Sequence, residues 1–411
     1  MMSQRIYAFV TTRALKIIKP LFLYTAIVLI SVVITLKCYD YYLGDKIPSL
    51  PGIRIESTER LLQTLELFPY TGWHMQANFH YTGDMPWEPY RYDYDVQSGP
   101  MGFFIEFDPE NPPPKQANEF RILYTGGSGA QGWGAQTNEH MLHKQLENRL
   151  NELYAPKGVF VRVINMAMGS TVTYQNFIAL NRWGHSLEGD MILTYSGRNE
   201  IWVPLFHEKV SDTHYYFTEL NALAMAARGS EFPPGLAWLR DLFPNIMTRT
   251  TLGYALKIMF CHEYFLNRAR ESYKSSRGLP NLSAQHFLDE VGIPFYIHSI
   301  RSIKRDFSGI PILLAWQAQN PSELDHLKGI YSDLEEDYYN RMYEKVCSGL
   351  DGYMNATWSF INIHKIFEND PKPYIGTHLG NEGHKVVAEI IADKLSKDFD
   401  TEISSRAVQN K

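Results

Sequence analysis

The sequence has few cysteines and no excess of positive charge. Three cysteines in 411 residues are too few for a disulfide scaffold. A formal net charge of -6 argues against broad nucleic-acid binding, which needs a basic surface. The chain is 45% hydrophobic and only 20% charged, which excludes intrinsic disorder. It also lacks internal repeats and the Gly-Lys-Ser/Thr of a P-loop, so we expect a folded protein that is not a P-loop nucleotide enzyme.

Only one stretch is uncharged over membrane length. It runs from Pro20 to Leu36 between Lys19 and Lys37 and is rich in Leu, Ile and Val. Roughly 17–25 apolar residues span a bilayer, and lysines at the ends can snorkel to its surface. A cleaved signal peptide is the alternative, but the preceding stretch is long and no small-x-small cleavage site follows. We predict an uncleaved signal anchor at about 20–37 and a single-pass membrane protein.

The charge is divided unevenly along the chain. Residues 1–46 hold six Lys or Arg and two acids, which leaves 33 basic and 43 acidic residues for 47–411. Because basic residues flanking a span stay in the cytoplasm, the N-terminus is predicted to lie inside. The main domain is then predicted to lie outside, in the periplasm or the extracellular space.

Beyond residue 46 the pattern changes twice. Residues 47–118 mix Pro, Gly and aromatic residues and are predicted to form a spacer and a β-rich or loop-rich cap. From 119 to 400, strand and helix patterns alternate, which predicts an α/β fold with a parallel sheet covered on both faces. A largely helical insertion is expected at about 201–300, and 401–411 form a tail. The expected strands lie at 120–125, 158–167, 190–197 and 310–318.

The first expected strand leads into a turn of small residues that contains two motifs. Gly127, Gly129 and Gly132 match G-x-G-x-x-G, but the next helix is expected only near Asn138 and the second strand ends in Asn165 rather than an acid. Both points disfavour dinucleotide binding. The other motif is Ser128, which the glycines leave sterically open as a nucleophile.

Later loops carry further candidates. Gly169 follows the second strand, Asn199 follows the third, and His378 precedes the last helix, which Asn381 is expected to cap. Since ligands bind beyond the carboxyl ends of parallel strands, these loops can converge on one crevice with Ser128.

In this order of motifs the sequence resembles the SGNH (GDSL-type) hydrolase superfamily over roughly 120–398, apart from the insertion after Glu200. The resemblance implies a flavodoxin-like three-layer α/β/α sandwich that cleaves or transfers acyl groups without metal or cofactor. It implies Ser128 as the nucleophile and His378 as the general base. The N–H groups of Ser128 and Gly169 and the amide of Asn199 would form the oxyanion hole.

Two positions depart from the family pattern. The last block is D-x-x-H in the family, but Ile375 stands three residues before His378. Glu200 replaces the usual Asp of the third block. Loss of the triad acid can cost orders of magnitude in rate. Asp370 could substitute through loop geometry, or the site could work as a Ser–His dyad in which a backbone carbonyl holds the second ring nitrogen.

Other polar residues are expected to have structural roles. His140 and His143 lie at i, i+3 on an expected helix without a third ligand, so no metal site is predicted. His384 is expected to be structural, and Cys261 and Cys347 could pair, although their spacing does not require it.

The leading hypothesis is a membrane-anchored serine esterase that removes acyl groups, acetyl in the first place, from an envelope glycan or a related ester. An O-acyltransferase with the same acyl-serine intermediate is the second hypothesis. A glycan-binding or assembly protein that lost the triad acid is the third, and Ile375 is the residue that favours it.

Overall fold

The computed structural model describes most of the chain beyond residue 93. The described residues are 65–68, 72–83, 94–169, 171–207, 264–265, 267–268, 283–351, 357–370, 372–375 and 377–407. All of them belong to one compact unit, Thr64–Lys411. The predicted signal anchor at 20–37 lies outside the described residues. Among those residues, no helix combines the length and the apolar character needed to cross a membrane.

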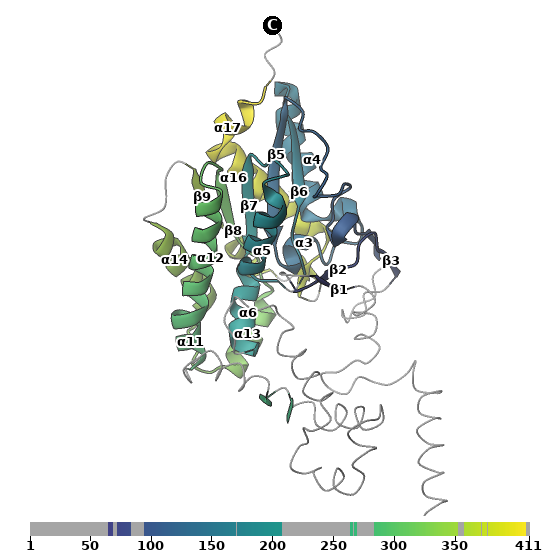
Figure 1. The fold of residues 1–411 in the computed structure, drawn as a ribbon. Helices are drawn as coiled ribbons and strands as arrows, with labels where there is room; N and C mark the ends of the chain where they lie inside the picture. Colours follow the sequence, from purple (N-terminus) through teal and green to yellow (C-terminus); the bar gives the residue numbers. More distant parts are fainter. Residues whose placement is uncertain are drawn as a thin grey trace, which may run out of the picture. The chain divides into compact units, whose positions relative to one another are not determined.

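A five-stranded sheet forms the centre of this unit (Figure 1). Its strands are β5 (Glu119–Gly126), β6 (Phe160–Asn165), β7 (Met191–Ser196), β8 (Ile312–Trp316) and β9 (Trp358–Asn362). The spatial order is β6-β5-β7-β8-β9, and every pairing is parallel. In chain order this is 2-1-3-4-5, the flavodoxin-like order. The predicted parallel α/β fold is confirmed, and β9 is a strand that the sequence pattern did not predict.

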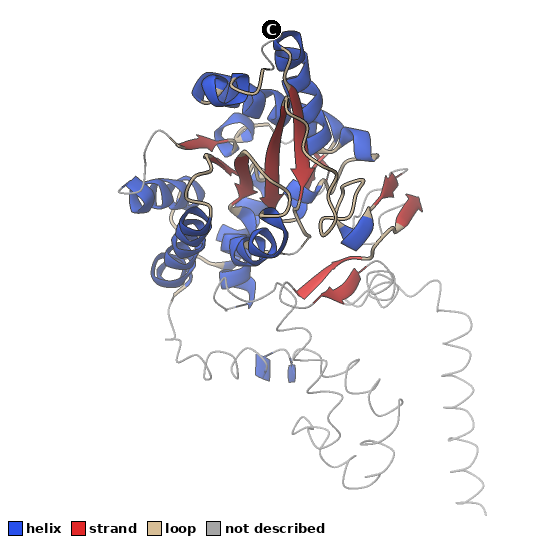
Figure 2. Cartoon of the chain, turned by 45° about the horizontal axis from the view of Figure 1, so that its top comes forward, coloured by secondary structure: helices blue, strands red, loops and turns tan. Residues whose placement is uncertain are grey.

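Helices cover both faces of the sheet (Figures 1 and 2). One layer contains α4 (Leu142–Tyr154) and α16 (Asn381–Asp398). The other contains α5 (Thr173–Ala179), α12 (Ile293–Asp306) and α14 (Tyr338–Leu350). Successive residues of a strand point to opposite faces, so Ile122 and Tyr124 pack in the first core and Leu123 packs in the second. The expected three-layer sandwich is therefore present.

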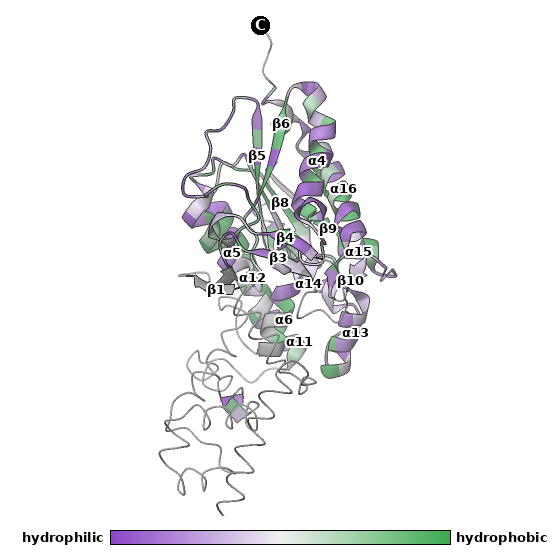
Figure 3. Ribbon diagram, turned by 90° about the vertical axis from the view of Figure 1, so that its right-hand side faces the viewer, coloured by the Kyte–Doolittle hydropathy of each residue, from purple (hydrophilic) through white to green (hydrophobic). Residues whose placement is uncertain are grey.

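The helices of the first layer are amphipathic, as their sequence spacing predicts. Leu142, Leu146 and Leu150 of α4 are buried, and Val387 and Ile391 of α16 are buried opposite them. Figure 3 shows mostly green strands in the centre, whereas α4 and α16 carry both colours. Each such leucine contributes about 1.5–3 kcal/mol through its burial.

Residues 65–107 add two small antiparallel pairs to the core domain. Strand β1 (Leu65–Phe68) pairs with β2 (Gly72–Met75), and β3 (His80–Gly83) pairs with β4 (Tyr94–Gln97). The spacer and cap expected between 47 and 118 stay a prediction, because part of this range lies outside the described residues. After β4 the chain joins the core, where the ring of Phe103 packs edge-on against Trp183 at 5.1 Å.

Most of the expected insertion at 201–300 lies outside the described residues. Within the described part, α6 (Arg198–His207) follows β7, and α12 starts at Ile293. Tyr296 and Ile300 of α12 are buried in the core. The last residues of the expected insertion therefore belong to the helix that covers the sheet before β8.

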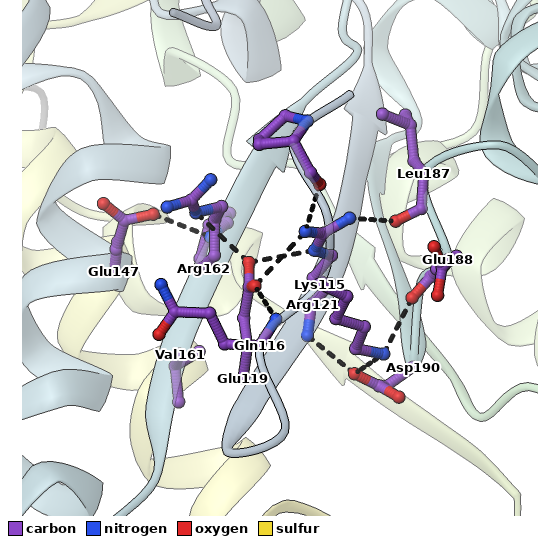
Figure 4. A network of polar contacts seen from close by, with 12 residues as sticks. Lys115, Gln116, Glu119, Arg121, Glu147, Val161, Arg162, Leu187, Glu188 and Asp190 are labelled. Carbon is purple, nitrogen blue, oxygen red and sulfur yellow. Dashed lines mark hydrogen bonds and ion pairs between the residues drawn. The ribbon is translucent and has the colours of Figure 1, made fainter. Parts of the chain in front are cut away.

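A network of charges closes the amino end of β5 (Figure 4). Arg121 is 0% exposed and Glu119 is 1% exposed, and Nε of Arg121 lies 2.9 Å from Oε1 of Glu119. The guanidinium also donates to the carbonyls of Leu187 (3.0 Å) and Pro113 (2.8 Å). Its backbone N–H donates to the carboxylate of Asp190. Burial acts to raise the pKa of Glu119, but hydrogen bonds from Arg121 and the Gln116 backbone, with the Arg121 and Arg162 charges, lower it below its usual range.

Candidate active site

Ser128 stands directly after the carboxyl end of β5. It opens α3 (Ser128–Gln131), a single turn that starts earlier than the helix expected near Asn138. The residue before it has to be glycine, because a Cβ on Gly127 would lie 2.5 Å from Nδ2 of Asn199 and 3.2 Å from the Thr171 carbonyl. The turn therefore brings Ser128 beside the loops that follow the two neighbouring strands.

His378, which lies near the C-terminal end of the sequence, contacts Ser128 in the fold. It begins β11 (His378–Leu379), which pairs with β10 (Tyr374–Ile375) in a short hairpin. Its Nε2 lies 2.9 Å from Oγ of Ser128, although 250 positions separate the two residues. The two side chains are 8% (Ser128) and 7% (His378) exposed. This distance suits transfer of the hydroxyl proton to the imidazole.

Two groups confine the His378 ring. The indole of Trp133 lies against it, with ring centroids 5.6 Å apart at 48°. The hydroxyl of Thr377 lies 3.0 Å from Nδ1. The sequence analysis singled out neither residue. Thr377 is adjacent to His378 in the chain, which is the one signal that could have drawn attention to it.

The position of the family's acid is apolar here. Ile375 lies opposite His378 in the β10–β11 ladder. Its Cδ1 would be 2.6 Å from a Cβ on Gly380, so its side chain packs toward the start of α16. Asp370 accepts a hydrogen bond from the backbone N–H of Lys372 at 3.0 Å. Among the described residues it makes no contact with His378, so the structure does not place Asp370 in the role of the acid.

The loops that were expected to supply an oxyanion hole lie together beside Ser128. The Asn199 amide donates to the Thr171 carbonyl at 2.6 Å, next to Gly127. The backbone N–H of Met168, just before Gly169, donates to the carbonyl of Gly126 at 3.1 Å. A Cβ on Gly169 would lie 2.8 Å from Oε1 of Gln131. The structure thus brings together Ser128, Gly169, Asn199 and His378, and their catalytic roles stay predictions.

Glu200, the other departure from the family pattern, joins two of these loops. It is buried and accepts from the N–H of Thr173 at 2.8 Å, from its hydroxyl at 2.7 Å and from the N–H of Gly197 at 2.8 Å. Burial raises the pKa of Glu200 above its usual range, against these hydrogen bonds. The carboxylate ties the loop after β6 to the turn after β7, and no contact with His378 is present among the described residues. The sequence pattern did not reveal this function.

Buried neutral histidines support the turn beyond Ser128. Nδ1 of His143 lies 3.0 Å from the Asn165 amide, which also donates to the carbonyl of Gln131. Burial, followed by nearby Lys144 and His384, lowers the pKa of His143 to about 3. Nε2 of His384 lies 3.2 Å from the Trp133 carbonyl, and burial lowers its pKa to about 4. Both rings therefore stay uncharged at neutral pH.

Two local expectations were wrong. Asn381 does not cap the last helix, because Gly380 occupies the N-cap. Its amide instead makes two hydrogen bonds to Gln136, at 3.0 Å to the backbone N–H and 2.8 Å to the side chain. His140 and His143 do not share a helix, since His140 ends a separate 3-10 turn, Asn138–His140, before α4 begins.

Metal and thiol candidates add nothing to this site. Within the described ranges no group of three or more His, Cys, Asp or Glu side chains is arranged to hold a metal ion. Cys347 is a free thiol, and its suggested partner Cys261 lies outside the described residues.

Comparison with known proteins gives distant structural neighbours. No family model matches the chain, and no curated protein matches it either. A two-domain esterase active on acetylated mannans shares 12% identity and a TM-score of 0.35, over 69% of this chain and 50% of that one. A family 3 carbohydrate esterase from Clostridium thermocellum shares 12% identity and a TM-score of 0.37, over 71% of this chain and 100% of that one. The lipase/acylhydrolase from Enterococcus faecalis shares 10% identity and a TM-score of 0.38, over 68% of this chain and 96% of that one.

These neighbours are esterases and acylhydrolases, the class to which the sequence motifs point. The chain spans about half the length of the two-domain esterase. At identities of 9–14% and TM-scores below 0.4, the neighbours by themselves assign neither an activity nor a substrate. Any assignment therefore rests on the residues of the site.

Proposed function

We propose that the chain is a serine esterase of the SGNH type. The observation that carries the proposal is the 2.9 Å contact between Oγ of Ser128 and Nε2 of His378 at the carboxyl edge of a parallel sheet. A serine hydroxyl becomes a useful nucleophile only when a base can take its proton, and this contact supplies the base.

The reaction then runs in two halves. In the first, Oγ of Ser128 forms a bond to the ester carbonyl carbon while His378 takes the hydroxyl proton. Collapse of the tetrahedral intermediate breaks the bond to the alcohol oxygen, which leaves with the proton from His378. In the second half, water attacks the acyl-serine, gives its proton to His378, and releases the carboxylic acid as Ser128 recovers its proton.

The oxyanion of each intermediate is assigned to three donors. They are the backbone N–H groups of Ser128 and Gly169 and the Asn199 amide. Rigid glycine turns and a buried amide suit this role, because donors that are fixed before the reaction need no reorganisation during it. In this reading, the amide of Asn199 would exchange its contact with the Thr171 carbonyl for the oxyanion or share it between the two.

The substrate and location follow from the sequence as part of the same proposal. We place the domain outside the cytoplasmic membrane, anchored by residues 20–37, with an acyl ester of an envelope glycan as its substrate. The uncharged span and the basic residues that precede it support this location. Neither a metal nor an organic cofactor has a step in the proposed reaction.

The test uses the full-length chain in detergent. Wild type should react with a fluorophosphonate probe and hydrolyse p-nitrophenyl acetate. Ser128→Ala should abolish both, and His378→Ala should lower both by about 10³-fold or more. Ser405→Ala is the matched control, because Ser405 is exposed near the C-terminus and should leave labelling unchanged. Wild type that neither labels nor turns over would exclude the enzyme and favour a non-catalytic glycan-binding protein.

An O-acyltransferase is the second candidate, and the low exposure of Ser128 and His378 favours it. At 8% and 7% exposed, the two side chains are largely sheltered from solvent water. A sheltered acyl-serine can be passed to an acceptor alcohol before water reaches it. Adding a sugar acceptor to the ester assay distinguishes the two activities. A transferase produces acylated sugar at the expense of free acid, whereas an esterase releases the same amount of acid with or without the sugar.

A further inference from the structure

We propose that the Thr377 hydroxyl takes the place of the missing triad acid and orients the His378 imidazole. This inference rests on the proposed serine-esterase function and names a positioning residue for it. Its basis is the 3.0 Å contact between Oγ1 of Thr377 and Nδ1 of His378, on the ring nitrogen opposite the one that faces Ser128.

Each nitrogen of the His378 ring faces a hydroxyl group. For His378 to act as base, Nε2 must be free of hydrogen and accept the Ser128 hydroxyl proton. Nδ1 must then carry the hydrogen of the neutral ring, and the Thr377 oxygen is placed to accept it. Because a hydroxyl can also donate, the contact does not select a tautomer; it holds the ring so that Nε2 points at Ser128.

The carboxylates that could compete for this role are used elsewhere. Asp370 accepts from the backbone of Lys372, and Glu200 accepts from Thr173 and Gly197. The family's acid position is Ile375, whose side chain packs toward Gly380. Within the described part of the chain, no acidic side chain contacts the His378 ring, so orientation by a neutral oxygen fits the charges around it.

The chain also limits how the ring can turn. Trp133 packs on His378 at 5.6 Å, and a Cβ on Gly134 would lie 3.1 Å from Cβ of His378. With the ring packed on one side, the contact of Thr377 with Nδ1 limits its rotation. A hydroxyl orients the ring but supplies no full negative charge for the imidazolium that forms during the reaction.

The loss of activity expected without the Thr377 hydroxyl is smaller than the loss known for a triad carboxylate. Loss of a carboxylate from a serine triad can cost about 10⁴-fold in kcat. Loss of one neutral hydrogen bond corresponds to roughly two- to twelvefold in rate. For Thr377→Val we expect kcat to fall by about five- to twelvefold with KM unchanged, because the hydroxyl acts on the base and not on bound substrate.

The experiment compares three variants of the full-length chain in detergent. Thr377→Val should slow turnover and fluorophosphonate labelling to the same extent, and Thr377→Ser should restore both to within about threefold of wild type. Thr137→Val is the matched control, since the Thr137 hydroxyl makes the same kind of contact, 2.8 Å to Nδ1 of His140. It should leave kcat unchanged. Thermal unfolding of each variant shows whether the fold is retained.

The outcomes separate this inference from the proposed function. Equal turnover by wild type and Thr377→Val overturns it, as does a rise in KM with kcat unchanged or a failure of Thr377→Ser to restore activity. ¹⁵N-histidine NMR of the same proteins does not depend on activity. We expect the Nδ1 resonance of His378 to differ between wild type and Thr377→Val, because the variant loses the hydrogen bond at this nitrogen. An unchanged resonance would refute the role of Thr377 even if the wild type proved inactive.

Discussion

Strand β5 carries a buried ion pair at its amino end and leads into a turn of glycine and serine at its carboxyl end. At the amino end, Arg121 and Glu119 are paired, and the guanidinium satisfies two further carbonyls (Figure 4). At the carboxyl end, Ser128 and His378 share one hydrogen bond beside the neutral amide of Asn199. One strand thus separates a buried ion-pair network from a serine–histidine contact made by uncharged donors and acceptors.

This difference teaches how the two ends divide stability and chemistry. Full charges buried at the amino end must be paired, because an unpaired buried charge is strongly destabilising. At the carboxyl end, donors that wait for a substrate have no charged partner. Neutral amides and backbone N–H groups suit this position, because leaving them without a partner destabilises the fold less than leaving a full charge unpaired. A charge that is buried near the carboxyl end is paired as well, since Arg198, just after β7, lies 2.8 Å from Glu323.

Arg121→Met should give the largest effect, and only on stability. It leaves buried Glu119 with only the partly exposed Arg162, 3.3 Å away, so the loss should approach the value of about 3–5 kcal/mol typical of a broken buried pair. The activity per folded molecule should not change, because the network lies at the opposite end of β5 from Ser128. Urea unfolding followed by tryptophan fluorescence gives the stability, and turnover at low urea gives the activity. The double variant Glu119→Leu/Arg121→Met should recover part of the loss, and no recovery would contradict the pairing argument.

Asn199→Ala should mainly lower activity and change stability little. Removing an oxyanion donor costs about 10²–10³-fold in kcat. The unfolding free energy should change much less than for Arg121→Met, because Asn199 contributes one neutral hydrogen bond. Asn181→Ala is a matched control, since the exposed amide of Asn181 also donates to a carbonyl, that of Phe177, at 3.0 Å. A loss of stability with unchanged kcat would remove Asn199 from the proposed oxyanion hole.

Glu200 is a buried carboxylate near the carboxyl end of the sheet, where the proposed site otherwise uses neutral groups. Glu200→Gln tests whether it serves stability, activity or both. A buried carboxylate that holds three donors lies between the loops of two proposed oxyanion donors. An amide at this position offers a single acceptor oxygen and turns an NH₂ group toward the remaining N–H. We expect a loss of about 1.5–3 kcal/mol in stability together with a lower kcat. If stability alone falls, the carboxylate is only structural.

The sheet could be predicted largely from the sequence, because its inner strands leave a strong signal. β7 and β8 are buried along their whole length, and their sequences are largely apolar, with no charged residue. β9, at the edge of the sheet, is buried only at Trp358 and Ser359 and half-buried in its other residues. Its pattern therefore resembled a loop. Edge strands pack on one side only, which weakens the periodic signal.

The site was predictable in its motifs and not in its supporting contacts. Ser128, Gly169, Asn199 and His378 follow a characteristic order along the chain, and the fold brings them to one edge. The contact of Thr377 with the ring depends on the shape of one hairpin. The Asn381 bonds to Gln136 join positions 245 apart. Spacing in the sequence cannot encode which buried side chain such a group meets.

The smallest predicted effect is on the pH dependence of stability. Groups near the carboxyl end of β5 and those at its amino end lose their contributions in different pH ranges. Burial lowers the pKa values of three histidines from 6.5, to about 3 for His143 and to about 4 for His364 and His384. Below pH 6.5 the unfolded chain binds protons that the folded chain does not, so the stability from these residues is lost as pH falls toward those values. Glu119, whose pKa is lowered, keeps its contribution until the pH falls below the ordinary range of a carboxyl group.

Between pH 7 and pH 5.5 we therefore expect a loss of about 1 kcal/mol for each of the three histidines. Urea midpoints at both pH values measure it. His384→Gln should remove about a third of this slope, while His286→Gln, at an exposed histidine on α11 (Ala284–Phe287), should leave it unchanged. A slope that survives loss of His143, His364 and His384 together would mean that these buried rings are not the acid-sensitive part of the domain.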